Sequence, residues 1–175
     1  VGQKIYEIVN AMETRAKSIG EDMRGGQPTP GNIMGGLSSI EEKSLGAIVK
    51  SGHRPIQGVL DYTESIGDKK GLWIKDAPGR EPEILTGMAA TGAQCMMFST
   101  GRGAPQGFPS MPVIKICGNP VTYARMEHDM DLNAGLIIKG EKSIEQVGEE
   151  AYALMRQVLS GRMTSNEALS YFGSV

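Results

Sequence analysis

Apolar residues recur at helical spacing near both ends of the chain. Residues 3–23 predict an amphipathic helix that Gly20 or the Gly25-Gly26 pair ends. A second long helix is predicted from Ser143 to about Ser160, and Thr164 caps a last short helix. The inward faces are Ile5, Ile8, Val9, Met12, Ala16 and Ile19 in the first helix, and Ile144, Val147, Ala151, Leu154 and Val158 in the second.

Shorter apolar runs lie between these helices and read as strands. They cover residues 56–60, 72–74, 95–98 and 113–117. Helices are predicted from Pro82 to about Gly92 and after the Asn119-Pro120 cap. This alternation predicts an α/β fold with three layers, in which helices flank a mostly parallel, Rossmann-like sheet, with extra helices at the C-terminal end.

Two stretches interrupt this pattern. Residues 25–32 are rich in Gly and Pro, so we expect a linker without helix or strand interior. A capping-box pattern of Ser38 and Glu41 then predicts a helix that starts at Ser39 and ends before Gly52. Residues 130–139 are expected to form a loop with a short strand or helical turn. The inward residues of the helix after Ser39 are Ile40, Leu45, Ile48 and Val49.

Composition excludes several classes of function. The 175 residues suit a compact core, and a net charge of -2 offers no basic excess for nucleic acid. No apolar run approaches the length of a membrane span, and no signal segment opens the chain. Cys95 and Cys117 both sit in apolar runs, which favours buried, reduced thiols over a disulfide. We therefore expect a cytoplasmic protein with neither a membrane nor a nucleic-acid partner.

The glycine-rich stretch at residues 98–109 joins two predicted strands and is the leading candidate for a site. Its glycines let backbone N–H groups converge on an anion, Thr100 adds a hydroxyl, and Arg102 adds a planar fork for a carboxylate or phosphate. The alternative is a mobile surface loop with one solvated arginine. The spacing is not that of a GxGxxG motif, so a nicotinamide cofactor is not supported.

Other candidate residues precede this loop. Asn32 stands before the helix that starts at Ser39, whose N-terminus is a natural anion site. Lys43 lies unusually early in that helix for a cation, although on physical grounds alone a solvated lysine is the better explanation. His53 and His128 are isolated, and no metal-ligand spacing is present. From the residues alone, the chain is an anion-binding α/β domain.

Several motifs resemble the altronate/galactarate dehydratase family. The segment from Thr29 to Gly46, which contains PGN, GGLSSIEEKSLG, resembles that family's PGN…GGLTTIEEKALG stretch. Ser99-Thr100-Gly101-Arg102-Gly103 resembles its TTGRG loop, and residues 112–119 and 130–135 fall where it has similar segments. The likeness extends from about residue 28 to residue 140 or beyond, and the family includes the large subunit of sulfolactate sulfo-lyase.

The resemblance implies a lyase, namely a hydro-lyase that removes water from a sugar acid to give a 2-keto-3-deoxy acid. It also implies a divalent metal, Fe²⁺ being expected. Thr100, Gly101, Arg102 and Gly103 would then hold the substrate, and Asn32 and Glu41 would line the same pocket. Arg102 would clamp the carboxylate, while Lys43 or Glu42 would transfer the proton.

Family members are much longer than this chain. We therefore expect residues 1–27 to be a helix and linker from a preceding domain and residues 28–175 to be the C-terminal α/β domain of a dehydratase. Metal ligands would lie in N-terminal segments, which implies that this piece alone is inactive. Its partners would be a small anionic substrate, the N-terminal domains or a small partner subunit, and a second copy in a homodimer. The alternatives are a sulfolactate sulfo-lyase fragment and a non-catalytic module that binds an anion or scaffolds a partner.

Overall fold

The computed structural model describes residues 1–34 and 37–173. The chain divides into two compact units. The first comprises residues 1–61 and 68–76, and the second comprises residues 62–67 and the described residues from 77 onward. No helix in the described part of the chain is both long and apolar enough to cross a membrane.

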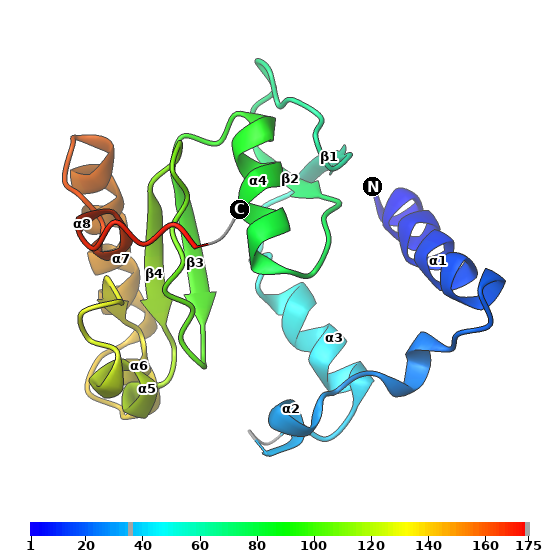
Figure 1. The fold of residues 1–175 in the computed structure, drawn as a ribbon, viewed down its shortest axis with the longest axis horizontal. Coiled ribbons are helices and arrows are strands. Elements are labelled where there is room, and N and C mark those ends of the chain that lie inside the picture. The colour runs from blue at the N-terminus through cyan, green and yellow to red at the C-terminus, as the bar shows by residue number, and fades with distance from the viewer. Residues whose placement is uncertain (35–36, 174–175) are drawn as a thin grey trace. The chain divides into compact units, whose positions relative to one another are not determined.

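The first unit is mainly helical with one small parallel sheet (Figure 1). Its strands pair from Ile56 opposite Leu72 to Leu60 opposite Lys75. Gly58 is required in this sheet, because a Cβ there would lie 2.3 Å from a ring carbon of Trp73. The elements are α1 (Gly2–Ser18), a 3₁₀ turn (Met23–Gly25), α2 (Pro30–Met34), α3 (Ile40–Val49), β1 (Ile56–Leu60) and β2 (Leu72–Lys75).

Three expectations for this unit were wrong in detail. Residues 30–34 form a short helix, because Pro30 suits a first helical turn and Thr29 accepts a hydrogen bond from the backbone N–H of Asn32. Helix α3 is capped by Ser39, which accepts from the N–H of Glu42, and not by Ser38. The face of α3 expected to point inward is exposed, with Ile40, Leu45, Ile48 and Val49 at 40%, 63%, 67% and 77%.

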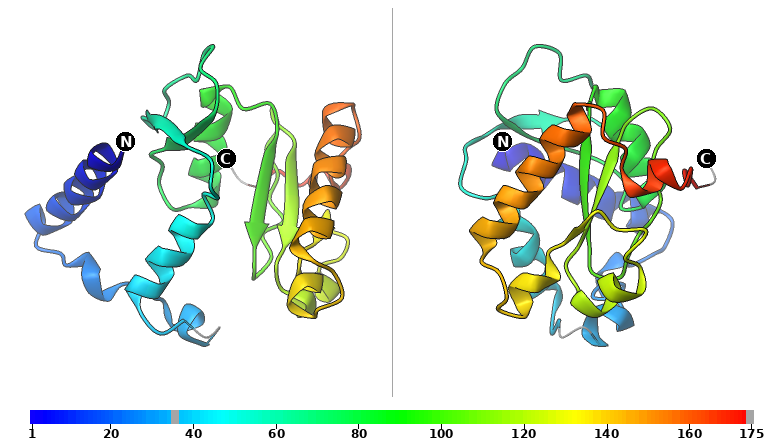
Figure 2. Two further views of the ribbon diagram at one scale, coloured as in Figure 1. Left: turned by 180° about the vertical axis from the view of Figure 1, so that it is seen from behind. Right: turned by 90° about the vertical axis from the view of Figure 1, so that its left-hand side faces the viewer.

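The second unit is a three-layer α/β sandwich. Its sheet has the order β3-β4-β5, and all its pairs are parallel. Figures 1 and 2 show α4 on one side of this sheet and α7 on the other. Its elements are α4 (Glu81–Thr91), β3 (Met96–Thr100), β4 (Val113–Cys117), α5 (Pro120–Arg125), β5 (Leu132–Asn133), α6 (Gly135–Ile138), α7 (Ile144–Leu159) and α8 (Ser165–Ala168).

Strand β4 supplies the core of both layers. Val113 packs with Leu85 of α4, whereas the next residue, Ile114, packs with Leu154 and Val158 of α7. Neighbouring strand residues point to opposite faces, so one short apolar run can fill two cores. The α/β class and parallel pairing are thus confirmed, but the strands form two small sheets, and Ile144, which was expected to face inward, is 69% exposed.

The first residues of β4, which precede its pairing with β5, make hydrogen bonds with side chains along this edge. Asn166 Nδ2 donates to the carbonyl of Val113 at 2.6 Å, and Asp131 Oδ2 accepts from the N–H of Lys115 at 2.7 Å. Asp131 also accepts from the N–H of Ser165 at 2.7 Å, which ties α8 to the sheet. Buried backbone groups need hydrogen-bonding partners, so these side chains supply bonds that a further strand would otherwise make.

We expect Asn166→Ala to destabilise the protein by about 1–3 kcal/mol, because it leaves the buried carbonyl of Val113 without its donor. Chemical denaturation of the intact protein measures this loss. Gln157→Ala, which removes an exposed amide from α7, is the matched control and should stay within about 0.5 kcal/mol. Equal stability of the two variants would contradict the role given to Asn166.

Candidate active site

The ends of the three parallel strands of the second unit form one edge. β3 ends at Thr100, β4 ends at Cys117 and β5 ends at Asn133. In open parallel α/β sheets, ligands bind beyond the carboxyl ends of the strands. The glycine-rich loop predicted as an anion site begins at this edge.

Hydrogen bonds brace the start of this loop. The N–H of Gly118 donates to the carbonyl of Thr100 at 2.8 Å, and the hydroxyl of Thr122 in α5 donates to the carbonyl of Gly101 at 3.1 Å. Thr100 Oγ1 also accepts from the N–H of Arg102 at 3.3 Å. The start of the loop is therefore anchored to β4 and α5.

Gly103 has a backbone conformation that favours glycine, with φ +79°. A Cβ at this position would lie 2.2 Å from the sulfur of Met126. At Gly101 the same test finds no atom within 4 Å. The two glycines of the Gly-Arg-Gly sequence therefore serve different purposes, and only Gly103 is needed by the packing of α5.

Arg102 projects from the braced loop into solvent. Its backbone N–H bonds Thr100, but its guanidinium makes no hydrogen bond or ion pair within the described residues. Its five N–H donors are therefore available to a planar anion at the carboxyl edge of the sheet.

The remaining predicted site residues lie in the first unit. Asn32 Oδ1 accepts from the N–H and the hydroxyl of Thr29 at 3.1 and 2.9 Å, and from Lys43 Nζ at 3.0 Å. Lys43 also donates to Gln27. The structure thus brings Asn32 and Lys43 together, although they are eleven positions apart in the sequence.

Glu41 and Glu42 are exposed on the first turn of α3. Hydrogen bonds from the hydroxyl and the N–H of Ser38, at 2.5 and 2.8 Å, lower the pKa of Glu42. Its own backbone N–H and the hydroxyl of Ser39 lower the pKa of Glu41. Each carboxylate is therefore a weaker base than a free glutamate. That these residues share a pocket with the Arg102 loop stays a prediction.

Sequence reasoning missed a buried ion pair in the second unit. Lys115 of β4 is fully buried and pairs with Glu81 of α4. Burial lowers the pKa of Lys115, and Glu81 opposes that shift. The only signal in the sequence is a lysine inside the apolar run Val113–Cys117. Such a residue is seldom buried without a charged partner.

The residues described here do not build a metal centre by themselves. Residues 1–34 and 37–173 contain no cluster of three or more His, Cys, Asp or Glu side chains that could hold a metal ion. A divalent metal usually needs such a set of donors.

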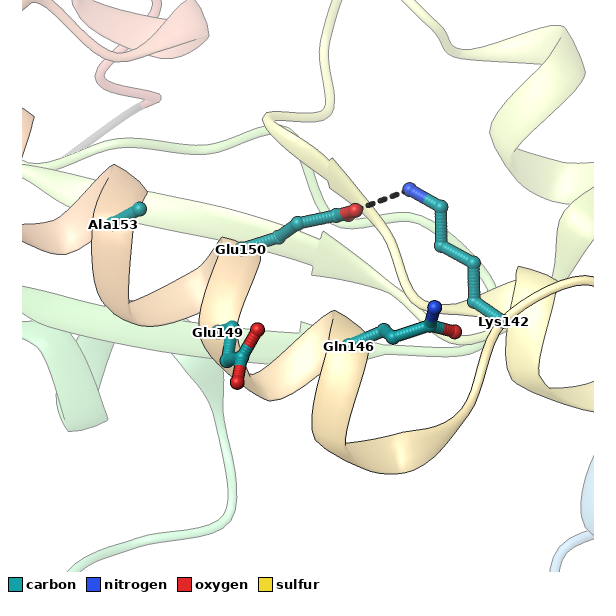
Figure 3. Close-up of a pocket in the computed structure, with 5 residues that line it drawn as sticks. All are labelled: Lys142, Gln146, Glu149, Glu150 and Ala153. Atoms are coloured by element: carbon teal, nitrogen blue, oxygen red, sulfur yellow. Dashed lines mark hydrogen bonds and ion pairs between the residues drawn. The ribbon is translucent and has the colours of Figure 1, made fainter.

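A hollow of about 350 Å³ lies on the surface beside α7 (Figure 3). Its charged lining residues are Lys142, Glu149 and Glu150, and Lys142 is paired with Glu150. The hollow therefore has a net negative charge, because Glu149 and Glu150 outnumber Lys142, and a negative surface does not suit an anionic substrate. The hollow contains none of the predicted site residues, so the carboxyl edge with Arg102 is the better candidate.

Comparison with known proteins decides the family. The model for the C-terminal region of D-galactarate/altronate dehydratase matches residues 1–173. The chain belongs to the galactarate/altronate dehydratase family. The family resemblance recognised in the sequence is thereby confirmed.

Curated relatives in this family include three different lyases. The chain is 37% identical to (2R)-sulfolactate sulfo-lyase subunit beta of Chromohalobacter salexigens over 97% of its own length and 43% of that protein. It is 39% identical to altronate dehydratase of Bacillus subtilis, over 80% of its own length and 28% of that protein. It is 37% identical to galactarate dehydratase (L-threo-forming) of Escherichia coli, over 93% of its own length and 31% of that protein. The chain spans less than half the length of these relatives.

We expect Gly103→Ala to destabilise the protein by about 1 kcal/mol or more, because the residue has positive φ and its Cβ would meet Met126. Gly101→Ala is the matched control, since its Cβ would enter open space. Thermal unfolding of both variants measures the difference. A melting temperature equally low in Gly101→Ala would show that the packing of α5 does not explain the glycine.

Proposed function

We propose that the chain is the substrate-carboxylate-binding, C-terminal part of a lyase that removes water from an altronate- or galactarate-type sugar acid. The product would be a 2-keto-3-deoxy acid. The observation that carries the proposal is the exposed Arg102 guanidinium, which has no side-chain partner among the described residues and stands on a braced loop at the carboxyl edge of a parallel sheet. Family membership supplies the reaction class.

The loop suits the charge that develops in such a reaction. Removal of the proton next to a carboxylate moves negative charge onto its oxygens and forms an enediolate. The guanidinium of Arg102, the hydroxyl of Thr100 and the N–H groups of Gly101 and Gly103 would bind these oxygens more strongly as the charge grows. Interactions that strengthen in the transition state accelerate the chemical step.

Further site residues come from the family resemblance and lie in the first unit. The resemblance implies that Asn32 and Glu41 bind substrate and that Glu42 or Lys43 transfers the proton. The contact between Lys43 and Asn32 supports a shared role for these two residues. A divalent metal, with Fe²⁺ the candidate, would be held by ligands from another part of the protein.

A sulfolactate sulfo-lyase is the second candidate, favoured by a relative that aligns with 97% of the chain. It would use the same carboxylate clamp and would release sulfite in place of water. The word "subunit" in that relative's name supports a small partner subunit, and a homodimer remains an additional proposal. The free thiols of Cys95 and Cys117 suit a reducing cytoplasm.

The first test measures 2-keto acid formed from altronate, galactarate and sulfolactate by the intact protein with Fe²⁺. We expect one acid to be converted, a chelator to abolish turnover and added Fe²⁺ to restore it. The 175-residue chain alone should give no product. Product from that chain would place all catalytic groups within it, and no product from either protein would favour a non-catalytic anion-binding module.

We expect Arg102→Ala to lower kcat/KM about 10- to 150-fold, which corresponds to about 1.5–3 kcal/mol for a charge-assisted hydrogen-bonding group. Arg102→Lys should recover only part of this loss, because an ammonium lacks the planar fork. Arg156→Ala, an exposed arginine on α7, is the matched control. Steady-state kinetics that leave Arg102→Ala undiminished would exclude the carboxylate clamp.

A further inference from the structure

Lys115 is the most deeply buried charged residue among those described, with 0% exposure on the central strand β4. It follows Val113 on the face of the sheet that packs against α4, where the core contains Leu85 and Met111. Removing an ammonium from water into such surroundings is costly unless it is paired. The sequence therefore retains a charge where an apolar residue would fit.

The partner of Lys115 reaches toward solvent. Its Nζ donates to a carboxylate oxygen of Glu81 and lies 4.3 Å from the centre of the Phe98 ring. The side chain of Glu81 is 19% exposed, whereas that of Lys115 is 0% exposed. The pair thus runs from the interior of the sheet to a carboxylate that water, and hence a substrate, can reach.

The pair lies close to the carboxyl edge that carries the Arg102 loop. Leu85 of α4 packs against Val113 and Met111, whereas Glu81, one turn earlier, meets Lys115 further along β4. Helix α4 therefore runs antiparallel to β4, and its first turn faces the end of the sheet. Lys115 pairs in register with Phe98, two residues before Thr100, which is about 7 Å along a strand.

Stability alone does not explain the pair. Asp131 and Asn166 use their side chains to satisfy the backbone of β4, but the hydrogen bond of Lys115 is to Glu81 and not to the backbone. Glu81 lies in the first turn of α4. Replacing a buried ion pair by apolar residues is often neutral or stabilising. A purely structural role would therefore be met equally well by two apolar side chains.

We propose that Glu81 moves the proton in the elimination and that Lys115 is the positioning residue that holds its carboxylate at the carboxyl edge. This proposal rests on the proposed lyase function. Glu81, Thr100 and Arg102 belong to one unit, so the assignment needs no particular placement of the first unit. Glu42, the alternative proton-transfer residue, is an exposed carboxylate held by Ser38.

A single carboxylate, that of Glu81, can both remove the proton and return it during the elimination. Glu81 takes the proton from the carbon next to the substrate carboxylate, and the C–H electron pair forms the C=C bond of an enediolate. The enediolate then collapses to a carboxylate, its electron pair forms a C=C bond to the next carbon, and the C–O bond there breaks with its electron pair leaving on the oxygen. Protonated Glu81 returns the proton to that oxygen, so water departs and Glu81 is again a carboxylate. The enol product takes up a solvent proton at carbon and releases its hydroxyl proton to solvent, which gives the 2-keto acid.

The test compares variants of the intact protein on the acid that the wild type converts. Glu81→Gln keeps the shape of the side chain but cannot accept a proton. We expect kcat to fall about 100- to 10,000-fold with KM within about threefold. Exchange of the substrate's α-hydrogen in D₂O, followed by NMR, should be lost. Lys115→Met should also lower kcat with little change in KM.

Two further variants separate function from folding. Glu81→Leu/Lys115→Met should melt at or above the wild-type temperature and still lack activity, and it decides the question if Glu81→Gln does not fold. Glu150→Gln, which breaks the half-buried pair between Glu150 of α7 and Lys142 just before that helix (Figure 3), is the matched control and should keep wild-type kcat.

Each outcome decides the proposal. An active double variant, or Glu81→Gln with kcat and exchange within twofold of wild type, overturns it while leaving the lyase function intact. Loss of α-hydrogen exchange in Glu42→Gln but not in Glu81→Gln overturns it in favour of Glu42. Absence of product from the wild type overturns the lyase function, and the role of Glu81 with it.

Discussion

Strand β4 is buried on both faces except at the half-buried Ile116, and the second unit is built around that constraint. Val113, Ile114, Lys115 and Cys117 are all 0% exposed. One face of the strand is covered by α4 and the other by α7. Along one edge it pairs with β3, and along the other it uses β5 and then the side chains of Asp131 and Asn166. A buried strand tolerates no unpaired polar group, so distant segments converge on it.

This burial concentrates chemistry at one end of the sheet. The strand interiors are filled, so polar and charged groups can meet a ligand only where the strands end. Thr100, the Arg102 loop and the cap of α5 at Asn119 all lie there. Gly103 lets the loop pass close to Met126, and Thr122 fixes its beginning. The same packing that stabilises the unit therefore orients the candidate binding groups.

Local pattern predicted most elements because each depends on neighbouring residues. The cap Ser143 with Gln146, and Asn119 followed by Pro120, begin helices where expected. The errors arose where local signals competed. Ser38 and Ser39 both resemble caps, and only Ser39 accepts from the helix N–H, while Ser38 binds Glu42. Pro30 was taken as a breaker, although proline suits the first turn of a helix.

For the candidate site, the family motifs and the Gly-Arg-Gly loop could be found from the amino-acid sequence, since both lie in contiguous stretches. The fold was needed to show that Lys115 is buried with Glu81, that Asp131 links β4 to Ser165, and that Asn166 donates to the carbonyl of Val113. These partners lie 34, 34 and 53 positions apart in the chain. Periodicity and capping signals reach only a few residues, whereas the cost of burying a charge or a backbone group depends on whatever the fold brings beside it.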